Sequence, residues 1–187
     1  MMRYAAFLRA INVGGRYVKM DALRSVLAHA DGLRNVQTYI ASGNLIFEAD
    51  GAPAEIERTI ETSLQAGLGF EVPTFVRSGP ELRAAASLQP FGADAQVPQS
   101  ALMISFMRAA PSEEAVEKLM GLQSEADLLH VEGREMYWLR LPSELPVTLS
   151  NINFERILGL ATMRNMNTVR ALLERYFADS DEGEPSG

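Results

Sequence analysis

The pattern of hydrophobic and polar positions in the first part of the chain predicts a strand, a helix and a hairpin. The apolar run at residues 3–9 predicts a buried strand. Apolar side chains spaced three and four residues apart between Met20 and Ala30 then predict a helix that crosses back over a sheet. The β-rich segments at 36–40 and 45–47, joined by small turn residues, predict a hairpin.

A second helix and a closing strand complete this pattern. Pro53 suits the first turn of a helix with one apolar face, and residues 70–76 predict the closing strand. Pro73 within that segment has no backbone N–H for a sheet ladder, which favours a place at the sheet edge. The resulting order, β-α-β-β-α-β, is that of the ferredoxin-like split βαβ unit.

A related pattern begins after a connection that is rich in Pro, Gly and Gln. Its expected elements are a strand, a helix, a hairpin and two C-terminal helices, over residues 102–107, 111–120, 128–131, 136–141, 153–158 and 168–177. The repeated β-α-β-β order indicates an internal duplication.

These patterns predict an α+β protein with two ferredoxin-like halves, each an antiparallel sheet with helices on one face, and with extra C-terminal helices. We expect an N-terminal subdomain at 1–78, a connecting helix and loop at 79–99, and a related C-terminal subdomain at 100–177. Residues 178–187 are expected to form a disordered acidic tail.

The amino-acid composition indicates the class of protein and excludes some kinds of functional site. A chain of 187 residues with 47% hydrophobic and 22% charged residues has the composition of an ordinary globular protein. It contains no apolar run of membrane-spanning length and no secretory leader pattern, so we expect a cytoplasmic protein that does not enter a membrane. The absence of cysteine excludes disulfides, cysteine nucleophiles and thiolate metal sites.

The net charge of −7 disfavours nucleic acid as a partner, because binding to phosphate polymers depends on clustered Lys and Arg. RNA-recognition motifs share the split βαβ order, but the predicted strand at 45–48 lacks their basic and aromatic pattern. Four acidic residues of the final ten contribute to the charge without a base, namely Asp179, Asp181, Glu182 and Glu184.

The first candidate site lies where the first strand leads into the first helix. It contains Arg9, Asn12, Gly14, Gly15, Arg16 and Lys19. Backbone amides of a glycine turn, a helix start and nearby cations together favour a bound anion. A Gly-Gly pair is also an ordinary turn, and it matches neither the dinucleotide nor the Walker pattern.

The second candidate site precedes the final helix, where Thr162, Arg164, Asn165, Asn167 and Thr168 gather. One of the asparagines is explained as an N-cap, whose side-chain oxygen accepts a hydrogen bond from a first-turn amide. A second asparagine and an arginine exceed what capping needs, and they indicate a ligand or interdomain role for Arg164.

The remaining polar groups have simpler explanations. Ser42, Gly43 and Asn44 have the composition of a turn. His29 and His130 have no companion at metal-ligand spacing, so we expect neither a metal site nor a cofactor.

Four sequence motifs resemble one known family. They are FLRAINVGG at 7–15, VKM at 18–20, TYIASGN at 38–44 and ATMRN at 161–165. Together they resemble the bacterial domain of unknown function 1697, over nearly the whole chain up to about Phe177. The resemblance implies a bacterial cytosolic α+β protein and no particular reaction. The matched positions include most of both candidate sites.

We therefore expect a small-ligand binding module for an anionic or nucleotide-like molecule. The expected ligand-binding residues are Arg9, Asn12, Gly14, Gly15, Lys19, Ser42, Asn44, Arg164 and Asn165. One alternative is a protein–protein interaction domain that uses the Pro73 edge or the Tyr137–Trp138 hairpin. Another is an enzyme of unknown reaction that uses Lys19. The sequence identifies no catalytic residue and no oligomeric state.

Overall fold

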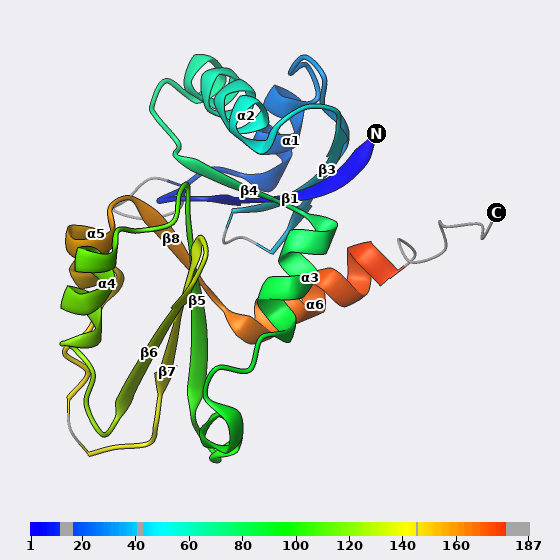
Figure 1. Cartoon of the computed structure of the whole chain (residues 1–187). Coiled ribbons are helices and arrows are strands. Elements are labelled where there is room, and N and C mark those ends of the chain that lie inside the picture. The colour runs from blue at the N-terminus through cyan, green and yellow to red at the C-terminus, as the bar shows by residue number, and fades with distance from the viewer. Residues whose placement is uncertain (12–16, 41–42, 145, 179–187) are drawn as a thin grey trace. The chain divides into compact units, whose positions relative to one another are not determined.

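The computed structural model describes residues 1–11, 17–40, 43–144 and 146–178 (Figure 1). The chain forms two compact units, one of Met1–Ala84 with the segment from Arg170 onward, and one of Ala85–Val169. Each unit holds one four-stranded antiparallel sheet with helices. The α+β class and the two sheets agree with the prediction.

The first unit follows the predicted order of elements. They are β1 (Met2–Leu8), α1 (Met20–Leu27), β2 (Arg34–Tyr39), β3 (Asn44–Ala49), α2 (Pro53–Leu68) and β4 (Thr74–Ser78). The strands lie in the order β2-β3-β1-β4, and each pair of neighbours is antiparallel. β4 is an edge strand as predicted, but Pro73 precedes this strand instead of lying within it.

The core of the first unit lies between its sheet and the pair α1 and α2. Tyr4, Ala6 and Leu8 alternate along β1 and pack with the buried leucine and isoleucine side chains of the two helices. α2 begins at Pro53 and ends before Gly69, whose φ of 80° is the left-handed conformation that glycine adopts at helix ends. The apolar face predicted for α2 is therefore the face that is buried in the structure.

The second unit repeats the strand order of the first. After α3 (Gly79–Ser87) and a 3₁₀ helix (Gly92–Gln96), its elements are β5 (Ala101–Met107), α4 (Glu113–Met120), β6 (Asp127–Glu132), β7 (Glu135–Arg140), α5 (Asn151–Leu158) and β8 (Ala161–Asn165). The strands lie in the order β6-β7-β5-β8. Leu119, Trp138 and Phe154 belong to the core between this sheet and its helices.

Sequence reasoning missed β8 and expected only helices in this region. The segment is five residues long, and its buried side includes the polar Thr162 and Arg164. No alternation of apolar and polar positions marks it as a strand, and it gains its strand geometry by pairing with β5. Arg164 therefore lies in a strand and not in a loop before the final helix.

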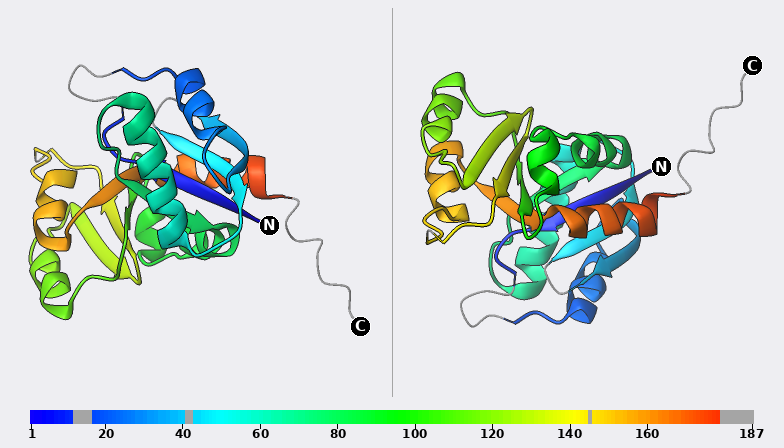
Figure 2. Two further views of the ribbon diagram at one scale, coloured as in Figure 1. Left: turned by 90° about the horizontal axis from the view of Figure 1, so that it is seen from above. Right: turned by 90° about the horizontal axis from the view of Figure 1, so that it is seen from below.

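The final helix, α6 (Met166–Phe177), returns to the first unit. From Arg170 onward it belongs with β1 and β3, and Figures 1 and 2 show its end on the face of their sheet opposite α1 and α2. The sequence places residues 100–177 in one C-terminal subdomain, whereas the structure assigns the segment from Arg170 onward to the first unit. The first sheet also carries helices on both faces, whereas the prediction places them on one.

Two further expectations concern the ends of the chain and the membrane. Residues 179–187 of the predicted tail lie outside the described residues. Within the described ranges, none of the helices has the length and apolar character needed to cross a membrane.

Candidate functional site

The first predicted cluster is described only in part. Five residues lie outside the described part of the chain: Asn12, Gly14, Gly15, Arg16 and Ser42. Arg9 is half-buried just after β1, and its backbone N–H donates to the Pro73 carbonyl at 2.9 Å. Lys19 is exposed immediately before α1, and its side chain makes no capping hydrogen bond. These two cations flank the loop that the sequence identified.

The turn before β3 lies against the end of β1. The Leu8 amide donates to the Gly43 carbonyl at 2.8 Å, and Asn44 Nδ2 donates to the Tyr39 carbonyl at 3.0 Å. Asn44 is fully buried. A Cβ at residue 43 would lie 2.7 Å from Ile11 Cγ2, and the φ of +75° there also favours glycine. Gly43 and Asn44 therefore hold the turn together, as the turn interpretation of this motif predicts.

Arg164 of the second cluster is buried in the second unit. Its Nη1 donates to Thr162 Oγ1 at 2.9 Å and to the Met163 carbonyl at 2.8 Å. Burial lowers the pKa of the Arg164 guanidinium to about 10, because water no longer stabilises its charge. These contacts join Arg164 to neighbouring residues of its own strand, and a ligand role for Arg164 stays a prediction.

Asn165 explains the start of α6. Its side chain is exposed, and its Oδ1 accepts a hydrogen bond from the Asn167 amide at 2.8 Å. This is the geometry of an N-cap, as the sequence suggested. The cluster around Arg164 and Asn165 belongs to the second unit, whereas Arg9 and Lys19 belong to the first. A ligand site shared between these clusters stays a prediction.

The Tyr137–Trp138 hairpin is part of the core of the second unit. Tyr137 is 1% exposed and its hydroxyl donates to the Ala85 carbonyl at 2.9 Å. Trp138 is 9% exposed, and its Nε1 donates to Asp127 Oδ1 at 2.8 Å. The two aromatic side chains are therefore not an exposed binding face.

The free edge of β4 is covered by carboxylates. Alternate backbone N–H groups along this strand each donate to a glutamate side chain of a neighbouring helix. The pairs are Thr74 with Glu61, Val76 with Glu57 and Ser78 with Glu81, each at 2.8 Å. Because these donors already have partners, the edge offers little to a strand from another chain. The Pro73 edge therefore gives weak support to an interaction domain.

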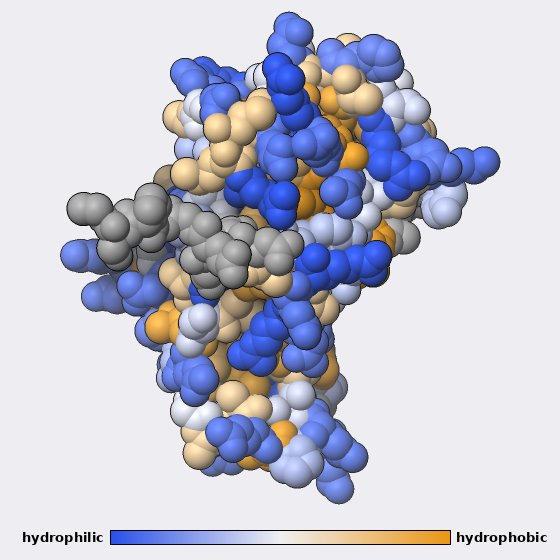
Figure 3. All heavy atoms as spheres, turned by 90° about the vertical axis from the view of Figure 1, so that its right-hand side faces the viewer, coloured by the Kyte–Doolittle hydropathy of each residue, from blue (hydrophilic) through white to orange (hydrophobic). Residues whose placement is uncertain are grey.

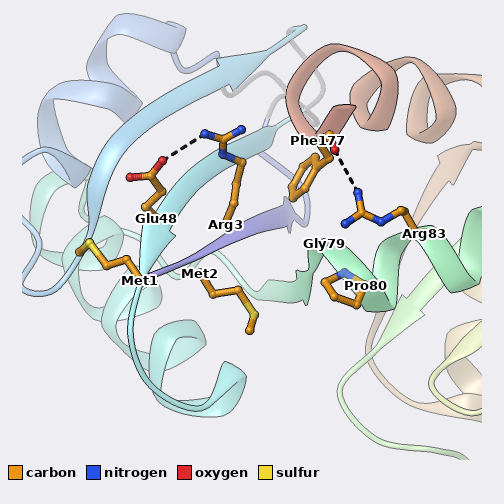
Figure 4. Close-up of a pocket in the computed structure, with 8 residues that line it drawn as sticks. All are labelled: Met1, Met2, Arg3, Glu48, Gly79, Pro80, Arg83 and Phe177. Atoms are coloured by element: carbon orange, nitrogen blue, oxygen red, sulfur yellow. Dashed lines mark hydrogen bonds and ion pairs between the residues drawn. The ribbon is translucent and has the colours of Figure 1, made fainter. Parts of the chain in front are cut away.

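A pocket that sequence reasoning missed lies within the first unit (Figure 4). Its volume is about 420 Å³. Its lining comes from β1, β3, the start of α3 and the end of α6, through Met1, Met2, Arg3, Glu48, Gly79, Pro80, Arg83 and Phe177. All of these residues are described and all belong to the first unit.

Two arginines of this pocket hold the end of α6. Arg3 Nη1 donates to the Tyr176 carbonyl at 2.7 Å, and Arg83 Nη1 donates to the Phe177 carbonyl at 3.0 Å. The last carbonyls of a helix carry partial negative charge, so the two guanidinium groups stabilise this end of α6. In Figure 4 the Phe177 ring lies between the side chains of Arg3 and Arg83.

Glu48 supplies a negative charge beside Arg3 in the lining of the pocket. Its carboxylate accepts from Asn35 Nδ2 at 2.7 Å and from Arg3 Nη2 at 3.2 Å. The hydrogen bond from Asn35, followed by that from Arg3, lowers the pKa of the Glu48 carboxyl below its ordinary value. At neutral pH the three charged side chains of the lining, Arg3, Arg83 and Glu48, carry one net positive charge.

The sequence contains only a faint signal for this pocket. Arg3 and Glu48 pair directly across β1 and β3, and each is the one charged residue of its strand. The remaining lining depends on contacts such as Arg83 with Phe177, which are 94 residues apart. Across the described residues, no group of three or more His, Asp or Glu side chains is placed to hold a metal ion.

Comparison with solved structures finds the same fold in another protein. The conserved bacterial protein SP0830 from Streptococcus pneumoniae matches with a TM-score of 0.70 and 21% sequence identity, over 92% of this chain and 97% of that chain. At this identity the likeness shows the fold alone.

Comparison by sequence identifies the family. No curated protein matches this chain. The family model described as "Protein of unknown function (DUF1697)" matches residues 1–137. This match includes three of the four motifs of the sequence resemblance, those at 7–15, 18–20 and 38–44, and ends before the fourth at 161–165. The chain therefore belongs to the DUF1697 family.

Proposed function

We propose that this chain binds a small anionic ligand in the pocket between Arg3 and Arg83. The observation that carries the proposal is that two guanidinium groups, from β1 and α3, line one pocket in which Glu48 is the single carboxylate among the described lining residues. A guanidinium binds carboxylate or phosphate through paired N–H donors. Arg3 gives Nη1 to the Tyr176 carbonyl and Nη2 to Glu48, and Arg83 gives Nη1 to the Phe177 carbonyl, so these contacts hold both guanidinium groups at the wall of the pocket.

The size and lining of the pocket indicate the class of ligand. A volume of about 420 Å³ falls in the range of small-molecule sites. Met2 and Pro80 provide apolar surface beside the two cations. The preferred ligand therefore combines a carboxylate or phosphate group with an apolar or planar part, which includes nucleotide-like molecules.

The loop flanked by Arg9 and Lys19 stays a second predicted place for the same anionic ligand. Its support is the exposed Lys19 ammonium before α1 and the half-buried Arg9 after β1. The enzyme alternative rests on Lys19 as well, and a cytoplasmic location stays a prediction of the sequence.

The interaction-domain alternative has less support. The outward amides of β4 are occupied by glutamates, and the Tyr137–Trp138 hairpin is buried. On the face that Figure 3 shows, hydrophilic side chains interrupt the hydrophobic areas. A docking face for another protein is expected to be a larger continuous apolar patch.

A ferredoxin-like duplication fits the described elements. Ala5, the fourth residue of β1, pairs with Ile46 and Arg77. Ile104, the fourth residue of β5, pairs with Tyr137 and Arg164. Arg77 and Arg164 thus hold equivalent places, and in each case Nη1 donates to the preceding carbonyl at 2.8 Å. We infer two copies of one β-α-β-β-α-β unit, which predicts that the two sheets superpose in a crystal structure.

The test of ligand binding is a thermal-shift screen of the purified chain against nucleotides, phosphorylated metabolites, organic acids and inorganic pyrophosphate. A ligand that binds only the native state stabilises it by about 2.7 kcal/mol at a concentration of 100 times Kd, which raises Tm. The same screen is run on Arg83→Gln, which removes a pocket cation, and on Lys19→Ala.

The matched control is Arg58→Gln, which removes an exposed arginine of α2 that does not line the pocket. We expect a ligand that still binds Arg58→Gln and Lys19→Ala with the wild-type affinity. Its affinity for Arg83→Gln should be at least tenfold lower. A hit that Lys19→Ala abolishes and Arg83→Gln leaves intact would move the site to the first loop. The absence of any hit would contradict the ligand-binding proposal.

A further inference from the structure

The candidate pocket contains charges of both signs. Arg3 on β1 pairs with Glu48 on β3, with Arg3 Nη2 at 3.2 Å from Glu48 Oε1. In strand order, β1 lies between β3, which carries Glu48, and β4, which leads directly into α3 with Arg83. Figure 4 likewise shows Arg3 between Glu48 and Arg83. The pocket therefore presents a carboxylate on one flank of Arg3 and a second guanidinium on the other.

The Glu48 carboxylate is ionised at neutral pH and can accept further hydrogen bonds. The hydrogen bond from Asn35, followed by that from Arg3, lowers its pKa. It accepts from these two side chains at 2.7 Å and 3.2 Å, whereas an ionised carboxylate has about four acceptor positions. The Glu48 side chain is 26% exposed, so a ligand in the pocket can reach it.

A third cation near Glu48 has a carboxylate partner of its own. The α-amino group of Met1 also lowers the pKa of Glu48, and it forms an ion pair with Asp50 Oδ1 at 3.0 Å. Arg3 and Glu48 balance each other's charge, so Arg83 accounts for the net positive charge of the lining side chains. The pocket thus has a positive end at Arg83 and an acceptor for positive charge at Glu48.

A carboxylate in this position changes which anions the pocket accepts. A ligand with a negative group at each end would place one of them beside Glu48, where the like charges repel. A ligand with an ammonium at one end would instead donate to Glu48 while its anionic group accepts from Arg83. Met2 and Pro80 provide apolar surface for the part of the ligand between its charges.

We propose that the pocket selects a zwitterionic ligand, with an ammonium group at Glu48, a carboxylate or phosphate at Arg83 and an apolar part between them. Amino acids and amino phosphates have this pattern of charges. The inference rests on the proposed function, because it needs the same pocket to bind a ligand. It adds that Glu48 determines specificity and that the positive group of the ligand matters as much as the negative one.

The test compares zwitterions with counterparts that lack only the amino group. Calorimetric titration measures the affinity of the wild-type chain for phenylalanine against phenylpropionate, ε-aminocaproate against caproate, and phosphoethanolamine against ethyl phosphate. In at least one pair we expect the zwitterion to bind about tenfold more tightly, the gain from a charge-assisted hydrogen bond at Glu48. Equal or tighter binding of the des-amino compound in every pair would overturn the inference.

The variant Glu48→Gln tests whether Glu48 causes this preference. We expect its affinity for the zwitterion to fall about tenfold and its affinity for the des-amino counterpart to rise about two- to fivefold, because the repulsion is removed. The matched control is Glu71→Gln, an exposed glutamate outside the pocket lining, which should change neither affinity. A preference that persists in Glu48→Gln would overturn the inference. The comparison within the wild-type chain does not depend on the stability of the variant.

The two proposals fail in different ways. Anions whose binding depends on Arg83, with no gain in affinity from an amino group, would support the proposed function and overturn the zwitterion inference. The absence of binding by every zwitterion and by every anion of the ligand screen would contradict the proposed function itself. Zwitterion binding that neither Arg83→Gln nor Glu48→Gln changes would place the ligand elsewhere and contradict both.

Discussion

At the scale of single residues, Gly43 shows how closely the turn before β3 packs against β1. An added Cβ would lie 2.7 Å from Ile11 Cγ2 and 3.1 Å from Leu8 Cβ, and φ is +75°. We expect Gly43→Ala to lower the free energy of unfolding by about 2–4 kcal/mol, through overpacking added to backbone strain. Urea denaturation followed by circular dichroism measures the loss.

Gly32→Ala is the matched control for this substitution. Gly32 has a φ of +78°, and no other group lies within 4 Å of the place that an added Cβ would take. We therefore expect Gly32→Ala to lower the free energy of unfolding by only about 1 kcal/mol, which is the cost of the left-handed backbone. Equal losses at the two positions would show that the contact with Ile11 is unimportant.

Glu48 makes a pH-dependent contribution to stability. Its pKa is lowered in the folded chain by Asn35 and then Arg3, so folding favours the ionised form. That stabilisation is complete above the ordinary pKa of a glutamate and is lost as the pH falls through the lowered folded value. We expect Glu48→Gln to reduce the urea midpoint at pH 7 and to have a smaller effect at pH 3.

The exposed Glu71 offers a control for this pH series. Glu71→Gln should leave the urea midpoint nearly unchanged at pH 7. A Glu48→Gln effect that grows toward acid pH would have the wrong sign for a lowered pKa and would contradict the assignment.

At the scale of elements, the edge of β4 depends on helix glutamates. Glu57 is 5% exposed and accepts from the Val76 amide at 2.8 Å. We expect Glu57→Ala to cost about 1–3 kcal/mol of unfolding free energy, because a buried N–H loses its acceptor. Glu57→Gln keeps a side-chain oxygen and should cost less. Urea denaturation measures both losses.

The same substitution tests whether the glutamates block strand addition. Light scattering after size-exclusion chromatography should detect more self-association in Glu57→Ala than in Glu57→Gln. Identical stability and identical mass for the two variants would mean that a side-chain oxygen at residue 57 does not protect this edge.

Sequence patterns predicted some elements of this fold and missed others. α2 was predictable because Pro53 and a repeated apolar face mark one helix on their own. β8 was not predictable because its buried face holds Thr162 and Arg164, which a pattern of apolar positions does not recognise. The turn role of Gly43 and Asn44 and the cap role of Asn165 were predictable, since both depend on neighbours in sequence.

At the scale of the whole molecule, the end of α6 completes the first unit. Phe177 is 1% exposed and packs against Gly79, where an added Cβ would lie 2.9 Å from Phe177 Cδ1. We expect Phe177→Ala to lower the free energy of unfolding by about 3–5 kcal/mol. It should also lower the affinity of the pocket for any anion that binds between Arg3 and Arg83. Urea denaturation and the thermal-shift screen measure the two effects.

Glu174→Ala is the control on the same helix, because Glu174 is exposed. This variant should stay within about 0.5 kcal/mol of the wild-type chain. If Phe177→Ala were as mild as Glu174→Ala, the end of α6 would not be part of the folded first unit.

The sequence by itself determined the class of fold, the order of elements in the first unit, the turn at Gly43 and the family. These depend on local periodicity, on Gly and Pro conformations and on short motifs, all of which are visible in neighbouring residues. The tertiary structure decided the rest: the strand at Ala161–Asn165, the covered edge of β4, the burial of Arg164 and the pocket between Arg3 and Arg83. The strand and the pocket bring together residues far apart in the chain, through sheet register and the return of α6. The covered edge of β4 and the burial of Arg164 depend on how helices and strands pack around them, which local patterns do not show.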